Sequence, residues 1–161
     1  MSPTLFVTVS LSISLGHPAE ARAQAPTPAP QITATSPALE QRDQPVTADD
    51  VAILTRAEAL LSNASMWNRA DDRECKDDEA TGKRSLFCAL QKACIEVLGS
   101  YDHRRVALQE VRFAVEDATR GREFEHRLRD FNNLPETRLE DVQRVLAVAK
   151  ERVSARLKAQ K

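Results

Sequence analysis

The sequence predicts an all-α fold, a small bundle of four main helices with a short fifth helix. Aromatic residues make up only 4% of the 161 residues and glycine occurs four times, whereas Ala, Leu, Glu and Arg are abundant, which favours helix over sheet. Four stretches place apolar residues three and four apart, as on one face of a helix. Convincing alternation of apolar and polar residues, which would indicate a strand, occurs only in "FVTVSLSISL" near the N-terminus.

The first helix is expected to run from about residue 47 to residue 64. Thr47 can cap its start, and Asp50 lies three residues further on as the partner of a capping box. Apolar residues follow at helical spacing: Val51, Leu54, Ala57, Leu60 and Leu61. The polar, highly charged stretch between Trp67 and Ser85 has no period of either kind, so we expect a loop there.

The second and third helices are marked by residues at their ends. One helix is expected from near Ser85 to Leu98, because Gly99 can form its C-terminal cap. The next is expected from about Asp102, which can cap its start, to Gly121. Each has an apolar face, formed by Leu86, Ala89, Leu90, Ala93, Val97 and Leu98 in the former and by Val106, Val111, Ala114, Val115 and Ala118 in the latter.

The C-terminal region predicts a short, highly charged helix or turn followed by the last helix. The short element carries Phe124, Leu128 and Phe131. Thr137 can cap the last helix, with Glu140 as its capping-box partner. The buried side of this helix is expected to include Val142, Val145, Leu146, Ala149 and Val153. Within this side, Val142, Leu146, Ala149 and Val153 are spaced four, three and four residues apart, which would also suit a homodimer through the last helix, as an alternative to packing on the protein's own core.

The first 23 residues are typical of a secretory signal peptide. An apolar run from Leu5 to Leu15 precedes Ala21-Arg22-Ala23, which matches a small-residue cleavage site. The run is too short to cross about 30 Å of hydrocarbon as a helix, so we expect no membrane span. Residues 24–45, rich in Pro, Ala, Thr and Gln, are interpreted as a disordered linker before a helical domain at residues 46–158. The protein is therefore expected to be periplasmic or secreted.

Charge and motifs argue against several classes of function. The net charge is −1, without the basic excess of a nucleic-acid binder, so nucleic acid is not an expected partner. Glu123 and His126 form one Glu-x-x-His motif, but a di-iron site needs two copies, and Ser100 stands where His103 would need a glutamate. The Gly-rich phosphate-binding loop and the usual hydrolase motifs are absent from the sequence. We predict no metal site, no cofactor and no catalytic residue.

Several short motifs follow one another between residues 51 and 153. They are "LTRAEALL" with Trp67, a polar loop through Gly82, "FCALQKA" with Cys88-Ala89-Leu90, Phe131-Asn132-Asn133, and "TRLEDVQRVLAVA" from Thr137. Their order resembles a bacterial family known as a domain of unknown function. In that family a Cys-Ala-Leu helix follows the polar loop, and Trp-Asn-Asp precedes a last helix that begins at a threonine. The resemblance implies the same order of helices and carries no activity with it.

Two departures from the family pattern are informative. Gln91 and Lys92 replace a small Gly-Ala pair, which puts a close helix crossing at that point in doubt. Asn133 replaces the acidic residue of Trp-Asn-Asp, so this position keeps a hydrogen-bond acceptor but loses the carboxylate. A cap needs only an acceptor, whereas a general acid or a metal site would need the ionisable group. We therefore interpret the position as structural.

Three cysteines, Cys75, Cys88 and Cys94, are an odd number for an exported protein. Cys88 and Cys94 lie six residues apart on one expected helix and on different faces of it, so any disulfide within the chain must include Cys75. The resemblance places the family's own cysteine at Cys88, as a small core residue, and implies that Cys75 and Cys94 are the additional pair. We predict a Cys75–Cys94 disulfide, with Cys75–Cys88 as the alternative.

The sequence favours a non-catalytic helical module that binds a protein partner in the cell envelope or outside the cell. The surface that we expect to bind comprises Trp67, Phe131, Asn132 and Asn133. Two alternatives stay open. One is an enzyme whose dispersed site includes Trp67, Glu123, His126 and Asn133. The other is a small-ligand binder that uses an apolar cavity in the bundle interior.

Overall fold

The structure, a computed structural model, describes residues 44–161 apart from the side chains of Asp77 and Asp78. The predicted signal peptide, residues 1–23, and residues 24–43 of the predicted linker lie outside the described residues. The described part is helical and contains no strand, which confirms the all-α prediction. Its elements are α1 (Ala48–Leu60), the 3-10 helix η1 (Ala64–Met66), α2 (Lys76–Thr81), α3 (Leu86–Leu98), α4 (Val106–Ala118), α5 (Arg127–Asn133) and α6 (Leu139–Ala159).

Four of these helices and the short α5 correspond to the five elements that the sequence predicts. The prediction of a loop before Ser85 is partly wrong, because this stretch contains α2. The first helix also ends earlier than predicted, at Leu60, and η1 begins at Ala64. α2 has only six residues and no apolar stripe that periodicity could reveal. Cys75 and Gly82 bound it, both in the left-handed region with φ of 58° and 70°. Glycine adopts this conformation without strain, which makes Gly82 a suitable end for the helix.

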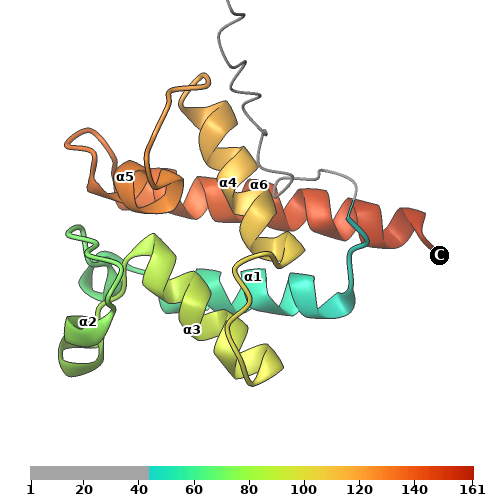
Figure 1. Cartoon of the computed structure of the whole chain (residues 1–161), viewed down its shortest axis with the longest axis horizontal. Helices are drawn as coiled ribbons and strands as arrows, with labels where there is room; N and C mark the ends of the chain where they lie inside the picture. The colour runs from blue at the N-terminus through green and yellow to red at the C-terminus, as the bar shows by residue number, and fades with distance from the viewer. Residues whose placement is uncertain (1–43) are drawn as a thin grey trace, which may run out of the picture. The chain divides into compact units, whose positions relative to one another are not determined.

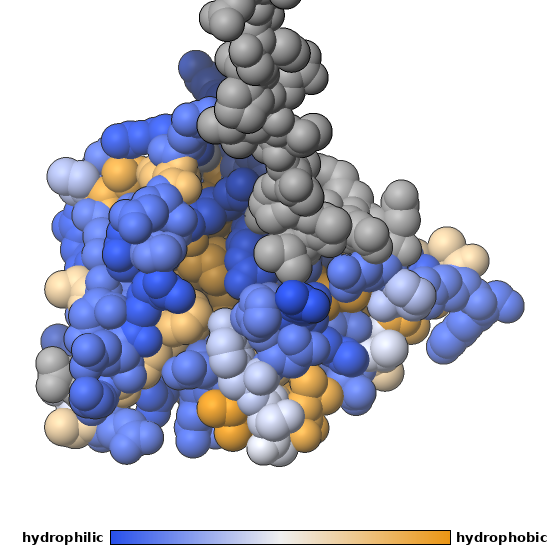
Figure 2. All heavy atoms as spheres, viewed as in Figure 1, coloured by the Kyte–Doolittle hydropathy of each residue, from blue (hydrophilic) through white to orange (hydrophobic). Residues whose placement is uncertain are grey.

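α6 is the longest helix and packs against α4 and α1, while α1 also packs against α3. Figure 1 shows α1 and α6 running side by side in opposite directions, with α3 and α4 crossing them. The interior between these helices is filled by side chains that are fully buried, among them Ile53, Leu54, Leu61, Leu86, Leu90, Leu108, Val111, Val115, Leu146 and Val153. The face in Figure 2 is largely hydrophilic, with smaller hydrophobic areas between the polar residues.

The apolar side of α6 is used by the protein's own core. Val142, Leu146, Ala149 and Val153 are all fully buried against the other helices. Their spacing is therefore explained by packing within the chain, and the homodimer through this helix stays a prediction. Within residues 44–161, none of the helices has both the length and the apolar character needed to cross a membrane.

The start of α1 follows the predicted capping box. The backbone N–H of Thr47 donates a 2.8 Å hydrogen bond to Oδ2 of Asp50, and the Thr47 hydroxyl donates to the same oxygen at 3.1 Å. The other oxygen, Asp50 Oδ1, accepts the backbone N–H of Ala107 at 3.2 Å and forms an ion pair with Nε of Arg105 at 2.9 Å. A buried carboxylate thus fixes the first turn of α1 to the first turn of α4.

Two other predicted helix starts are wrong. α4 begins at Val106 rather than near Asp102, whose carboxylate instead accepts the N–H of Arg104 and closes a turn. α6 begins one residue later than predicted, after Arg138, whose backbone N–H donates to Asp141. Thr137 is buried, and its hydroxyl donates a 2.7 Å hydrogen bond to the carbonyl of Phe131. Thr137 therefore connects α5 to the start of α6 instead of capping α6.

Candidate functional site

Asn132 joins three segments that are distant in the sequence. Its Oδ1 accepts the indole Nε1–H of Trp67 at 2.8 Å and the backbone N–H of Leu86 at 3.1 Å. Its Nδ2 donates to the carbonyl of Asn68 and to Oδ1 of Asn133, each at 3.1 Å. The side chain is fully buried, and these four bonds use both its donors and both acceptor directions. Asn132 therefore fixes the loop after η1 and the start of α3 onto α5.

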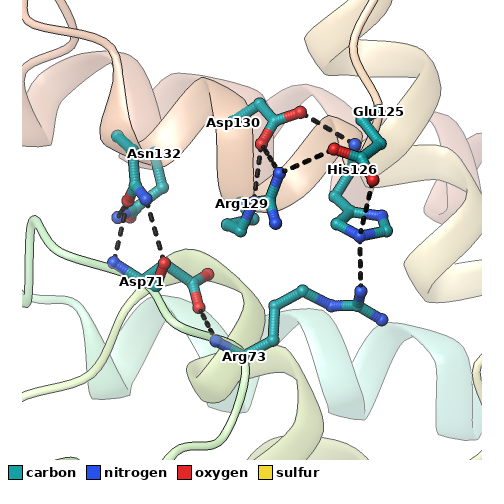
Figure 3. Close-up of polar contacts among 8 residues, drawn as sticks. Asp71, Arg73, Glu125, His126, Arg129, Asp130 and Asn132 are labelled. Atoms are coloured by element: carbon teal, nitrogen blue, oxygen red, sulfur yellow. Dashed lines mark hydrogen bonds and ion pairs between the residues drawn. The ribbon is translucent and has the colours of Figure 1, made fainter.

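Asn133 continues this network on the surface side. Its Oδ1 accepts the backbone N–H of Asp71 at 2.8 Å, and its Nδ2 donates to the carbonyl of Asp71 at 2.9 Å. Figure 3 shows this pairing of Asp71 with the end of α5. Asn133 thus pairs with the backbone of Asp71 through one acceptor and one donor, as a residue of a neighbouring strand would.

The structure brings together the four residues predicted to form a binding surface. Phe131 is 4% exposed, Asn132 is buried, and Trp67 is partly buried against the core. Because the amide groups of Asn132 and Asn133 are engaged in hydrogen bonds within the chain, their clearest role is to hold the loop. As a surface for a partner, the four residues stay a prediction.

The predicted Cys75–Cys94 disulfide is wrong, because Cys75 bonds to Cys88. The turn before α2 places Cys75 beside the first turn of α3, with 5.6 Å between the Cα atoms of Cys75 and Cys88. Cys94 lies further along α3 on another face and is buried with a free thiol. Its Sγ contacts the carbonyl of Ser100 and the backbone N–H of Asp102 instead.

An open pocket of about 540 Å³ lies next to the disulfide, between the loop before α2, the start of α3, α4 and the start of α5. We call it the arginine pocket. It combines four arginines and two histidines with apolar and aromatic side chains, and Glu125 is the carboxylate in its lining. The lining residues are Arg73, Phe87, Tyr101, His103, Arg112, Phe124, Glu125, His126, Arg127, Leu128 and Arg129.

Arg73 is the central cation of the pocket. Its Nη1 lies 2.8 Å from Nε2 of His126, and its guanidinium lies over the ring of Phe87, 5.6 Å from the ring centroid. Arginine can only donate, so in this hydrogen bond Nε2 of His126 is the acceptor. Among the described side chains, no carboxylate forms an ion pair with Arg73. The guanidinium of Arg73 therefore contacts the imidazole of His126 (Figure 3) and lies over the ring of Phe87.

The backbone around Arg73 is held in place by contacts on both sides of this residue. Its N–H donates a 2.7 Å hydrogen bond to Oδ1 of Asp71, and its φ of 66° lies in the left-handed region that most residues avoid. Two residues further on, Cys75 is held to α3 by the disulfide. On the other side, Asp71 is held to α5 by Asn133. The loop that carries Arg73 is thus fixed at both ends.

The two arginines of α5 that line the pocket, Arg127 and Arg129, have acidic partners. Arg129 lies 2.6 Å from Oδ1 of Asp130 and 3.5 Å from Oε2 of Glu125, and Arg127 lies 3.4 Å from Oε2 of Glu116. The pairing of Arg129 with Asp130 raises the pKa of its guanidinium. A second pocket, of about 590 Å³ beside α4 and α6, contains the pairs Arg122–Glu136, Arg144–Asp141 and Arg152–Asp117, and Arg120 also lines it. Unlike Arg127 and Arg129, Arg73 forms no ion pair with a carboxylate among the described side chains.

Tyr101 adds a hydrogen-bond donor to the pocket. Burial of the phenol raises its pKa above the ordinary value and outweighs the nearby positive charge of Arg112, so the hydroxyl keeps its proton at physiological pH. The ring meets that of Phe87 edge to face, with 6.1 Å between centroids and 85° between planes. The pocket therefore has a cationic side and an aromatic corner.

Asp130 secures the α5 side of the pocket, and its contribution to stability should depend on pH. Burial alone would raise the pKa of this carboxyl, but the backbone N–H of His126, at 2.8 Å, and the guanidinium of Arg129 outweigh burial and lower it. A carboxyl with a lowered pKa in the folded state stabilises the fold above its unfolded pKa of about 3.9, and this is lost as the pH falls through the folded pKa.

We therefore expect Asp130→Asn to lower the free energy of unfolding by about 0.5–1 kcal/mol at pH 7, because the amide keeps an acceptor but loses the charge. At pH 2, where more of this carboxyl is protonated in the folded protein, the difference should be smaller. Urea denaturation of both proteins at the two pH values measures this. An equal difference at both would contradict a charge-based role.

The dispersed residues of the alternative enzyme are divided between two places. His126 lines the arginine pocket, whereas Trp67 and Asn133 form the junction around the loop backbone. Glu123 is exposed and does not line either pocket described above. The pocket itself was not predicted from the sequence, because Arg73 and His126 are 53 positions apart and no local motif indicates that they are in contact.

Comparison with known proteins gives one match. A family of unknown function, DUF6197, matches residues 45–152. No curated protein and no solved structure matches the chain. The matched segment contains α1 to α5 and most of α6, so it includes the junction around Asn132, the disulfide and the arginine pocket. The motifs that suggested a domain of unknown function therefore led to the correct type of family, and the chain belongs to DUF6197, a family of unknown function.

Proposed function

We propose that this protein is an exported, non-catalytic binding module whose arginine pocket holds an anionic group of a ligand or of an envelope partner. The observation that carries the proposal is the charge of Arg73, which lies beside the imidazole of His126 and the ring of Phe87 and forms no ion pair with a carboxylate among the described side chains. A guanidinium presents several donors in one plane and suits carboxylate or phosphate oxygens. Tyr101 can donate a further hydrogen bond beside it.

Two features support export, and one contact in the pocket supports the absence of catalysis. The apolar run at Leu5–Leu15 with Ala21-Arg22-Ala23 suits a secretory signal, and a disulfide such as Cys75–Cys88 is typical of oxidising compartments. A nucleophile with a base oriented beside it would support an enzyme. In the pocket, however, the Nε2 lone pair of His126 is directed at Arg73, so that atom is not available as a base.

The test is a titration of the protein with inorganic phosphate, acetate and benzoate, followed by NMR chemical shifts of backbone amides. We expect saturable shifts at the pocket for at least one anion. Arg73→Gln should weaken that binding about tenfold or more, because a hydrogen bond to a charged group contributes about 1.5–3 kcal/mol.

The matched control is Arg144→Gln, which removes an exposed arginine paired with Asp141 at the other pocket. It should leave anion binding unchanged. Equal weakening by the two variants, or no saturable shift with any of the anions, would overturn the proposal.

A further inference from the structure

The arginine pocket has an apolar side that simple anion binding leaves unused. Phe87 and Tyr101 form an edge-to-face corner, and Phe124 and Leu128 line the pocket from the α4–α5 loop and α5. Phe87 and Phe124 are partly buried and pack against the core, so these rings are held in place. A hydrated inorganic anion on Arg73 would leave this surface in contact with water, whereas an aromatic ring would cover it.

The charge of the pocket limits the charge of its ligand. On the α5 edge, Glu116, Glu125 and Asp130 lie against Arg127 and Arg129, so these cations already face carboxylates. Glu125 also lies 3.8 Å from Nε2 of His126, at the mouth of the pocket. A dianion such as a phosphate ester would bring a second negative charge towards this glutamate. A single carboxylate would match Arg73, a cation that forms no ion pair with the described carboxylates.

We propose that the arginine pocket binds an aromatic monocarboxylate, with its carboxylate on Arg73 and its ring in the corner of Phe87 and Tyr101. This inference rests on the proposed function and names the class of ligand for the same pocket. The pocket volume of about 540 Å³ falls within the range of sites for small organic molecules. Tyr101 also lines the pocket, and its protonated hydroxyl is a hydrogen-bond donor of the kind that a carboxylate oxygen accepts.

The experiment compares four probes by the same NMR titration: 2-naphthoate, acetate, inorganic phosphate and the neutral 2-naphthamide. We expect 2-naphthoate to bind about tenfold more tightly than each of the others, because it alone satisfies both the cation and the aromatic corner. Phe87→Leu should reduce the affinity for 2-naphthoate by a larger factor than the affinity for acetate, because the ring of Phe87 contacts both the aromatic ligand and Arg73. Arg73→Gln should bring 2-naphthoate down to the level of 2-naphthamide.

The outcomes separate this inference from the proposed function. If acetate or phosphate binds as tightly as 2-naphthoate, the proposal of an aromatic ligand is overturned and the proposed anion site stands. Equal affinity for 2-naphthoate and 2-naphthamide would overturn the proposal that the carboxylate of the ligand binds Arg73. If none of the anions gives saturable shifts at the pocket, the proposed function fails together with this inference.

Discussion

Replacing Asn132 with alanine is expected to lower the free energy of unfolding by about 3 kcal/mol, because buried groups left without partners cost about 1–3 kcal/mol each. The change removes the acceptor of the Trp67 indole and of the backbone N–H of Leu86, and the donor to the carbonyl of Asn68. A domain of this size is stable by only about 5–15 kcal/mol, so the loss is a large fraction of the total.

Urea denaturation followed by tryptophan fluorescence measures this effect directly, because Trp67 is the single tryptophan of the chain and contacts the altered residue. Asn63→Ala is the matched control. Asn63 caps the exposed η1 and accepts the N–H of Ser65, so its loss should cost about 1 kcal/mol or less. Similar losses in the two variants would show that the Asn132 network contributes little to stability.

The same network explains why the position after Asn132 tolerates the loss of a carboxylate. The bacterial family that the sequence resembles has an acidic residue there, and the sequence alone predicts a structural role for this position. Asn133 Oδ1 accepts two hydrogen bonds, from Asp71 and from Asn132, and a carboxylate oxygen could accept both. The amide adds a donor to the Asp71 carbonyl. This geometry supports the structural interpretation.

Local patterns predicted the fold where local chemistry decides it. Thr47 with Asp50 and Ser85 with Gly99 mark helix ends through bonds made within a few residues, and the structure has those ends. Thr137 misled because its hydroxyl bonds to Phe131 in the preceding helix rather than to the helix it seemed to cap. The partner of the Thr137 hydroxyl depends on how α5 packs, and the four residues of a capping box do not indicate that packing.

The arginine pocket could not be predicted for a related reason. The sequence predicts a short, highly charged helix or turn before the last helix, and there Arg127 and Arg129 form ion pairs with Glu116 and Asp130. Arg73 instead lies beside His126 and Phe87, residues of two other segments, and forms no ion pair with a carboxylate among the described side chains. These contacts depend on the folded chain and cannot be seen in a local pattern.

Removing the disulfide by Cys75→Ser is expected to lower the free energy of unfolding by about 3 kcal/mol, the usual contribution of a crosslink that closes a loop of this size. The two cysteines are 13 positions apart, and α2 lies between them. The same change frees the segment that positions Arg73, so anion binding should weaken together with stability. In Asn63→Ala, which leaves the crosslink and Arg73 intact, anion binding should not change.

Intact mass after alkylation decides whether the protein in its own cell has this pairing. Cys94 is buried and is the only free cysteine, so the folded protein should take up no label, the unfolded protein one, and the unfolded and reduced protein three. A mass that begins at Gln24 would at the same time support export. Three labels without reductant would mean that the crosslink does not form in the cell. The loop would then lack its covalent attachment to α3, and the pocket would have to hold Arg73 through Asp71 and His126 alone.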